Sequence, residues 1–148
     1  MKVVIGCDHG GIVLKPAVIK AIESIGGTYI DVGTYTTDSC DYPDYAVKVA
    51  KAIIAGEAEK GILMCGTGIG ISIAANKVDG IRCAHVTDIF SAEMCAEHNN
   101  ANIMALGGRI SDEESVYNMV VKYLTTAFAG GRHQQRLDKI TAIEQEGI

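Results

Sequence analysis

Apolar segments of strand length alternate with segments of helical periodicity along the 148-residue chain. The first apolar run, Lys2–Cys7, has the length of a strand and is broken by an Asp-His-Gly-Gly sequence. Apolar residues then recur at helical spacing from Leu14 to Ile25, which places Pro16 in the first turn of that helix. The same alternation predicts further strands over 29–32, 61–65, 81–86 and 102–106, and helices over 44–55, 69–77, 88–97, 111–127 and from about 133 onward.

Strands that alternate with helices in this way predict βαβ units and a parallel sheet. The strands lack a clean alternation of apolar and polar residues, which is typical of a sheet covered on both faces. Five strands are too few for an eight-stranded βα barrel, so we expect an open, doubly wound α/β sheet. With no internal repeat or interior linker, residues 1–148 are predicted to form one domain. The basic C-terminal helix is long for a simple cap, and packing on a neighbouring subunit is an open alternative.

Composition narrows the class of protein. Hydrophobic residues make up 48% of the chain and charged residues 21%, as in ordinary soluble domains. A formal net charge of -5 disfavours nucleic acid and acidic membranes as partners, and no segment approaches the ~20 apolar residues of a membrane helix. Five scattered cysteines without an export signal or a C-x-x-C pair predict reduced thiols in the cytoplasm and no structural zinc site.

Candidate chemistry is expected where the strands end, because ligands of open parallel sheets bind outside the carboxyl ends of the strands. The segments that follow the predicted strands are 7–9, 65–70, 87–88 and 107–109. The most specific of them is 65–70, Cys-Gly-Thr-Gly-Ile-Gly, in which three glycines separate a strand from a helix. Such a turn presents backbone N–H groups to a phosphate, a carboxylate or a reaction oxyanion. Its G-x-G-x-G spacing differs from the dinucleotide-binding G-x-G-x-x-G pattern.

Cys65 begins this turn, and the same N–H groups would stabilise its thiolate. The thiol is a candidate nucleophile or general base, although a cysteine at a strand end is also an ordinary core residue. A cysteine phosphatase would carry an arginine six residues later, where this chain has Ile71, so that activity is disfavoured.

Two histidine segments and an arginine pair are further candidates. Asp8-His9 follows the first strand, although the aspartate could serve only as a helix cap. His98 and the asparagines after it follow a helix and are equally typical of an ordinary helix end. Arg132 and Arg136 share one helical face beside His133, a grouping that suits a dianionic phosphate as well as it suits a solvated surface.

Together these segments resemble the ribose-5-phosphate isomerase B family, which also contains hexose-6-phosphate isomerases of the galactose and allose type. The resemblance runs almost end to end. The motifs that carry it are 6–9 (Gly-Cys-Asp-His), 41–43 (Asp-Tyr-Pro), 65–72 (Cys-Gly-Thr-Gly-Ile-Gly-Ile-Ser), 74–77 (Ala-Ala-Asn-Lys), 98–99 (His-Asn) and 130–136 (Gly-Gly-Arg-His-Gln-Gln-Arg).

The resemblance implies a Rossmann-like three-layer α/β/α sandwich and a homodimer whose active sites are built from both subunits. It also implies a metal-independent isomerase without a cofactor, in which an enediolate forms between C1 and C2 of a sugar phosphate. Part of the family uses a glutamate base, and Cys65 with Ile71 assigns this chain to the cysteine branch. The resemblance implies that Cys65 is the base, that Thr67 assists it, and that the enediolate is stabilised by Gly66, Gly68, Ile69 and Gly70. It implies that His98 opens the sugar ring and that Asp8 orients the ring hydroxyls. The sugar is contacted by Tyr42 and Asn99, and the phosphate by His9, Arg109, Arg132 and Arg136.

The expected activity is therefore interconversion of D-ribose 5-phosphate and D-ribulose 5-phosphate in the pentose phosphate pathway of carbohydrate metabolism. A hexose-6-phosphate isomerase acting on allose or galactose 6-phosphate is an alternative of the same class. A non-catalytic phosphosugar-binding protein is an alternative of a different class, since it needs the arginines and the glycine turn but not a thiol base. A tetramer made of two dimers is an alternative assembly.

Overall fold

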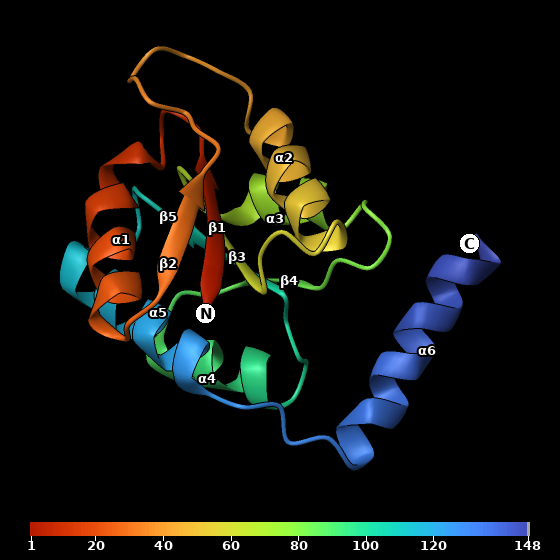
Figure 1. Ribbon diagram of the computed structural model, residues 1–148. Coiled ribbons are helices and arrows are strands. Elements are labelled where there is room, and N and C mark those ends of the chain that lie inside the picture. Colours follow the sequence, from red (N-terminus) through yellow and green to blue (C-terminus); the bar gives the residue numbers. More distant parts are fainter. Residues whose placement is uncertain (148) are drawn as a thin grey trace.

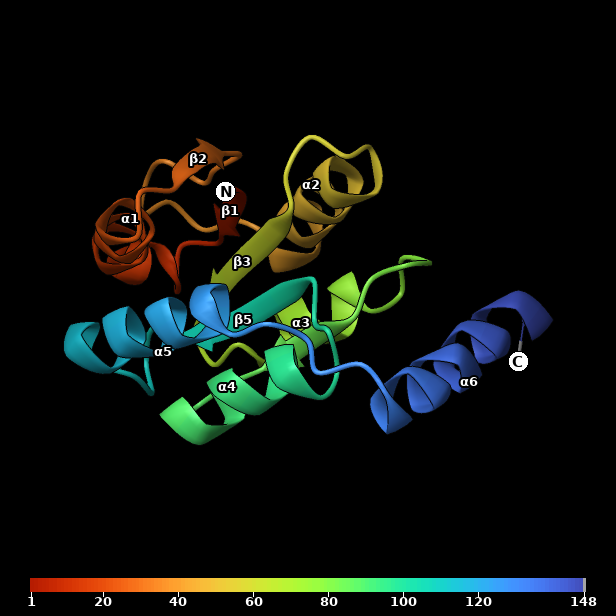
Figure 2. The same cartoon turned by 60° about the horizontal axis from the view of Figure 1, so that its bottom comes forward.

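In the computed structural model, which describes residues 1–147, five parallel strands form one sheet with helices on both faces (Figures 1 and 2). The strands are β1 (Lys2–Cys7), β2 (Thr28–Asp31), β3 (Lys60–Cys65), β4 (Cys83–His85) and β5 (Ile103–Gly107). The helices are α1 (Lys15–Ser24), α2 (Tyr42–Ile54), α3 (Ile69–Ala75), α4 (Ile89–Glu97), α5 (Glu113–Thr125) and α6 (Arg132–Glu146), with a short 3₁₀ helix at Ile12–Leu14. The predicted α/β class and the five-stranded parallel sheet are confirmed.

The strand order β2-β1-β3-β5-β4 places a topological switch point between β1 and β3. From β1 the chain moves outward to β2, and then returns to the opposite side of β1 for β3. The loops that follow β1 and β3 consequently diverge to opposite faces and leave a crevice at the carboxyl ends of these strands, where doubly wound sheets bind ligands.

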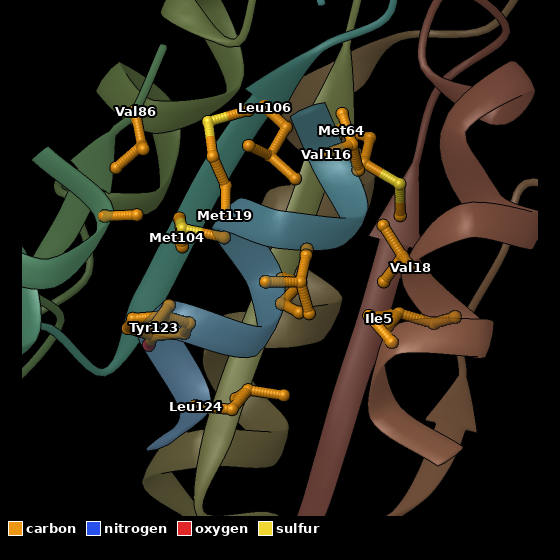
Figure 3. Packing of buried hydrophobic residues seen from close by; sticks show 14 of the residues in the cluster. Ile5, Val18, Met64, Val86, Met104, Leu106, Val116, Met119, Tyr123 and Leu124 are labelled. Atoms are coloured by element: carbon orange, nitrogen blue, oxygen red, sulfur yellow. The ribbon is translucent and has the colours of Figure 1, made fainter. Parts of the chain in front are cut away.

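The core is divided between the two faces of the sheet. On one face β1, β3 and β5 pack against α1, α4 and α5, and Figure 3 shows part of this layer, including Ile5, Met64 and Met119. Tyr123 is fully buried there, and its hydroxyl donates to the carbonyl oxygen of Ala101 at 2.9 Å. On the other face the strands pack against α2 and α3. Both faces are covered, which explains why the strand sequences show no clean alternation.

Most element boundaries differ from the predicted ones by one or two residues, and for two elements the reason can be identified. Helix α2 begins at Tyr42, two residues before the predicted start, because Pro43 lies in the first turn, where a helix needs no N–H donor. Strand β4 has three residues instead of the predicted six. The N–H of Arg82 donates to the side-chain oxygen of Asn102 at 2.8 Å, so the ladder begins only at Cys83.

Helix α6 extends away from the layered body, as both views show (Figures 1 and 2). Leu137 is its one buried residue within the part of the chain that the structure describes. Near its C-terminal end, both carboxylate oxygens of Glu144 accept the N–H of Gly80, at 3.1 and 3.2 Å. A groove of about 420 Å³ separates the helix from the β4 edge, with Ile81, Ile140 and Ile143 in its lining. No helix within residues 1–147 has the length and apolar character needed to cross a membrane.

A half-buried ion pair fixes the long loop between β2 and α2. The Lys15 ammonium group lies 2.9 Å from Oδ2 of Asp31 and also donates to the carbonyl oxygen of Thr34. It lies 5.0 Å from the centre of the Tyr35 ring. The Asp31 carboxylate in turn accepts the N–H of Gly33 at 2.9 Å. Loop and helix α1 are therefore joined through one ammonium group.

Replacing that ammonium group should destabilise the fold. In Lys15→Met the Asp31 carboxylate loses its partner while partly buried, and we expect a loss of about 2 kcal/mol in the free energy of unfolding. Urea denaturation measures it. Lys48→Met is the matched control, because the exposed Lys48 lies 5.0 Å from the centre of the Tyr45 ring but forms no ion pair in the described chain. Equal losses in the two variants would contradict the importance of the ion pair.

Candidate active site

Three loops meet at the carboxyl ends of β1, β3 and β5. The N–H of Gly108 donates to the carbonyl oxygen of Cys65 at 2.8 Å, and that of Arg109 to the carbonyl oxygen of Gly66 at 2.8 Å. On the other side, a Cβ atom added to Gly10 would lie 3.0 Å from the nitrogen of Gly66. The loops therefore contact each other through their backbones.

Cys65 is the last residue of β3, and it is buried, with 4% of its surface exposed. Its sulfur accepts the N–H of Gly68 at 3.1 Å. Gly68 has a φ of +80°, a conformation that a side chain would disfavour, and α3 begins directly after it. In the described chain, the N–H groups of Gly66, Thr67 and Gly70 have no acceptor. The turn therefore combines a thiol with backbone donors that an oxyanion could use.

Asp8 and His9 lie opposite this turn. Oδ1 of the buried Asp8 accepts the N–H groups of Gly10 and Gly11, at 2.8 and 3.0 Å. These bonds hold the turn after β1, but Asp8 is not the helix cap considered from the sequence, because neither the 3₁₀ helix nor α1 has a side-chain cap. Its Oδ2 is left for a ligand. Nδ1 of His9 accepts the N–H of Cys40 at 3.2 Å, so Nε2 carries the ring proton of a neutral imidazole. His9 can therefore donate a hydrogen bond from Nε2.

Tyr42 and Arg109 complete this group, because each lies against a glycine of the turn. A Cβ atom on Gly70 would lie 2.6 Å from Cζ of Tyr42, and one on Gly66 would lie 2.8 Å from Nη1 of Arg109. The predicted residues that the structure brings together at this end of the sheet are Asp8, His9, Tyr42, Cys65, Gly66, Thr67, Gly68, Ile69, Gly70 and Arg109.

The remaining predicted residues form a second group. The imidazole rings of His98 and His133 are stacked, with centroids 4.2 Å apart and planes at 15°. Arg132 and Arg136 are exposed at the start of α6, where Nη1 of Arg136 donates to the carbonyl oxygen of Arg132 at 2.9 Å. Desolvation lowers the pKa of His133, and the charges of His98 and the two arginines lower it further. Asn99 follows His98 on the surface. This cationic cluster favours a multiply charged anion such as a phosphate.

The two groups lie at opposite ends of the sheet in one chain. The N–H of Gly61, at the start of β3, donates to the carbonyl oxygen of Asn102. Asn102 lies four residues after His98, and Cys65 lies four residues after Gly61, which is about 13 Å along a strand. One chain therefore does not bring Cys65 and His98 to a common substrate.

Three residues near these groups were not predicted from the sequence. Cys40 contacts His9, Arg82 donates to the carbonyl oxygen of Asn100 at 2.8 Å and supports the loop after His98, and His85 contacts the turn after β3. Each depends on a contact between distant segments. The five cysteines are free thiols.

Burial separates three of these thiols from the site chemistry. It raises the pKa of Cys7 to about 11, that of Cys83 to about 12 and that of Cys95 to about 11. These three thiols are therefore protonated at neutral pH and serve the core.

Comparisons with known proteins agree with this geometry. A family model described as Ribose/Galactose Isomerase matches residues 3–140. The chain is 45% identical to ribose-5-phosphate isomerase B of Escherichia coli, with 97% of each chain covered. It resembles the structure of ribose-5-phosphate isomerase B from Clostridium thermocellum with a TM-score of 0.97, 47% identity and full coverage of both chains. It also resembles the Mycoplasma genitalium ribose-5-phosphate isomerase B with bound ribulose-5-phosphate, with a TM-score of 0.91 and 37% identity, covering 98% of this chain and 97% of that one.

The contact between Gly70 and Tyr42 can be tested by a double-mutant cycle. Gly70→Ala should displace the tyrosine ring, because the new Cβ atom would overlap it. We expect Gly70→Ala to weaken binding of the sugar-phosphate ligand about tenfold in the wild-type background, measured by calorimetry. In the Tyr42→Ala background the same substitution should have little further effect. Equal effects in both backgrounds would show that the overlap does not matter.

Proposed function

Because the chain belongs to the ribose/galactose isomerase family, we propose that it interconverts D-ribose 5-phosphate and D-ribulose 5-phosphate. Its similarity to ribose-5-phosphate isomerase B over nearly its whole length supports this substrate. The observation that carries the proposal is the Cys65 thiol, held against a backbone N–H in a turn with further unpaired donors. This arrangement fits a base beside an oxyanion site.

In the proposed reaction the Cys65 thiolate removes the proton from C2 of the open-chain aldose. The electrons of the C2–H bond form the C1–C2 double bond, and the negative charge moves to O1. Backbone N–H groups of Gly66 and Gly70 stabilise that oxygen, more strongly as its charge develops. The Thr67 hydroxyl, whose oxygen accepts the N–H of Ile69 at 3.2 Å, assists proton movement between O2 and O1. The thiol then returns its proton to C1 and yields the ketose.

The other residues of the site bind and open the sugar. His98 donates the proton to the ring oxygen, while Asp8 uses Oδ2 to orient the ring hydroxyls. Tyr42 and Asn99 contact the sugar chain. The phosphate is held by Nε2 of His9 and by guanidinium groups, which bind phosphate oxygens in pairs. The guanidinium groups are those of Arg109, Arg132 and Arg136.

A homodimer with shared active sites reconciles this assignment with the separation of the two groups. Two copies related by a twofold axis can place the His98 group of one against the Cys65 group of the other, twice. Exposed apolar side chains support such contact, since Ile69 and Ile73 on α3, directly after the Cys65 turn, are 50% and 57% exposed, and Phe90 on α4 is 68% exposed. The projecting helix α6 and the groove beside it suit the same interface. A cytoplasmic location fits the five free thiols.

The base assignment is tested by assaying ribose 5-phosphate isomerisation in EDTA. Wild type should turn over, because backbone amides hold the enediolate without a metal ion. Cys65→Ala should lose about a thousandfold or more in kcat and still bind ribulose 5-phosphate. Cys83→Ala, which removes a thiol outside the site, is the control and should keep its activity. Near wild-type kcat in Cys65→Ala would refute the base assignment. No wild-type turnover on this substrate, with turnover of allose 6-phosphate, would move the substrate to the hexose class.

Shared sites predict complementation between two inactive variants. Cys65→Ala and His98→Ala should each be inactive alone, but dimers of one copy of each contain one site with both wild-type groups. After random exchange of subunits, about one quarter of the wild-type activity should return. A mixture of Cys65→Ala and Cys65→Ser is the control and should stay inactive. If the first mixture also stays inactive although subunits exchange, the sites are not shared.

A further inference from the structure

One peptide group connects the Cys65 thiol to the edge strand β4. The peptide between Thr67 and Gly68 points its N–H at Sγ of Cys65, at 3.1 Å. Its carbonyl oxygen lies 2.8 Å from Nε2 of His85. Because C=O and N–H of a trans peptide point in opposite directions, the two contacts hold the group from both sides. A carbonyl oxygen can only accept, so Nε2 of His85 carries the proton.

The orientation of this peptide is not fixed by the backbone alone. Gly68 has φ +80° and ψ −9°, the values of the third residue of a type II turn. In a type I turn the central peptide is reversed, and glycine is compatible with either form. The reversed form would aim the Thr67 carbonyl oxygen at the sulfur and repel a thiolate. The His85 hydrogen bond therefore favours the orientation that the base needs.

Gly68 also permits the close approach of the imidazole. A Cβ atom added there would lie 2.8 Å from Cδ2 and 3.1 Å from Nε2 of His85. The missing side chain thus leaves room for the ring directly behind the turn.

We propose that His85 is a positioning residue for the proposed base Cys65. By donating to the Thr67 carbonyl it holds and polarises the peptide, and the Gly68 N–H becomes a better donor to the thiolate. Hydrogen bonds in a chain strengthen one another in this way. The proposal rests on the proposed function only in taking Cys65 as the base, since the contacts themselves do not depend on it.

The position of His85 makes a selective test feasible. Its side chain is exposed, so replacing it opens no cavity in the core. Strand β4 is held independently of it, because the side-chain amide of Asn76 binds both the N–H and the carbonyl oxygen of Cys83, at 2.8 and 2.9 Å. The N–H of Val86 donates to the carbonyl oxygen of Ala105 on the other side of His85.

The experiment compares His85→Leu with His85→Gln, whose amide nitrogen can replace Nε2 as a donor. Two quantities are measured: kcat and KM for ribose 5-phosphate, and the rate of Cys65 alkylation by iodoacetamide, followed by peptide mass spectrometry. We expect His85→Leu to lower kcat and the Cys65 alkylation rate about three- to tenfold with KM nearly unchanged. His85→Gln should restore most of both.

Asn76→Ala is the matched control, because it weakens the attachment of β4 and leaves the imidazole contact in place. Comparable losses in Asn76→Ala and His85→Leu, or equal losses in His85→Leu and His85→Gln, would overturn the proposal in favour of a purely structural role. Unchanged kcat and alkylation in His85→Leu would also overturn it. If wild type fails to turn over any sugar phosphate while His85→Leu still slows Cys65 alkylation, the proposed function fails and the peptide contact stands.

Discussion

The backbone contact among three glycine-containing loops is the constraint on which the site depends. Parallel strands bring the ends of β1, β3 and β5 to one edge, but side chains at Gly10 or Gly108 would keep the loops apart. Their absence lets the loops hydrogen-bond directly and leaves other N–H groups of the Cys65 turn unpaired. This contact between the loops positions the Cys65 thiol, the unpaired N–H groups of its turn, and the adjacent side chains of Tyr42 and Arg109.

The sequence predicted most of the fold because hydrophobic periodicity reports burial directly. Lys2–Cys7 was predicted with its observed bounds, and Cys65 was placed at a strand end beside a glycine turn. The length of β4 was not predictable, because the Arg82 N–H is taken by the side chain of Asn102, twenty residues away. The contact of His85 with the turn was missed for the same reason, since only the folded sheet brings strand and turn together. The resemblance implied active sites built from two subunits, and the topology of one chain shows that the two groups of predicted residues lie at opposite ends of the sheet.

This division links chemistry to assembly. In a single chain the thiol and the cationic cluster are held at opposite ends of the sheet, so the proposed base Cys65 and the proposed ring-opening acid His98 can meet only if two copies of the chain combine. Helix α6 also suits an interface between two chains, because it carries two arginines yet has only Leu137 buried within the described chain. Its 15 residues are close to the length at which an isolated helix is marginal, so contacts beyond its own chain would add to its stability. For such a dimer, specific activity would fall on dilution as subunits separate.

The loop between β2 and α2 is secured at its two ends and exposed between them. Lys15 and Asp31 hold its beginning, and the Cys40–His9 contact holds its end just before Tyr42. The residues at 35–39 are all exposed. Residues can therefore be added or removed in the middle of the loop without moving the glycine turn or the core. For evolution and for enzyme redesign, this gives a segment whose length can vary while the residues around the Cys65 turn keep their positions.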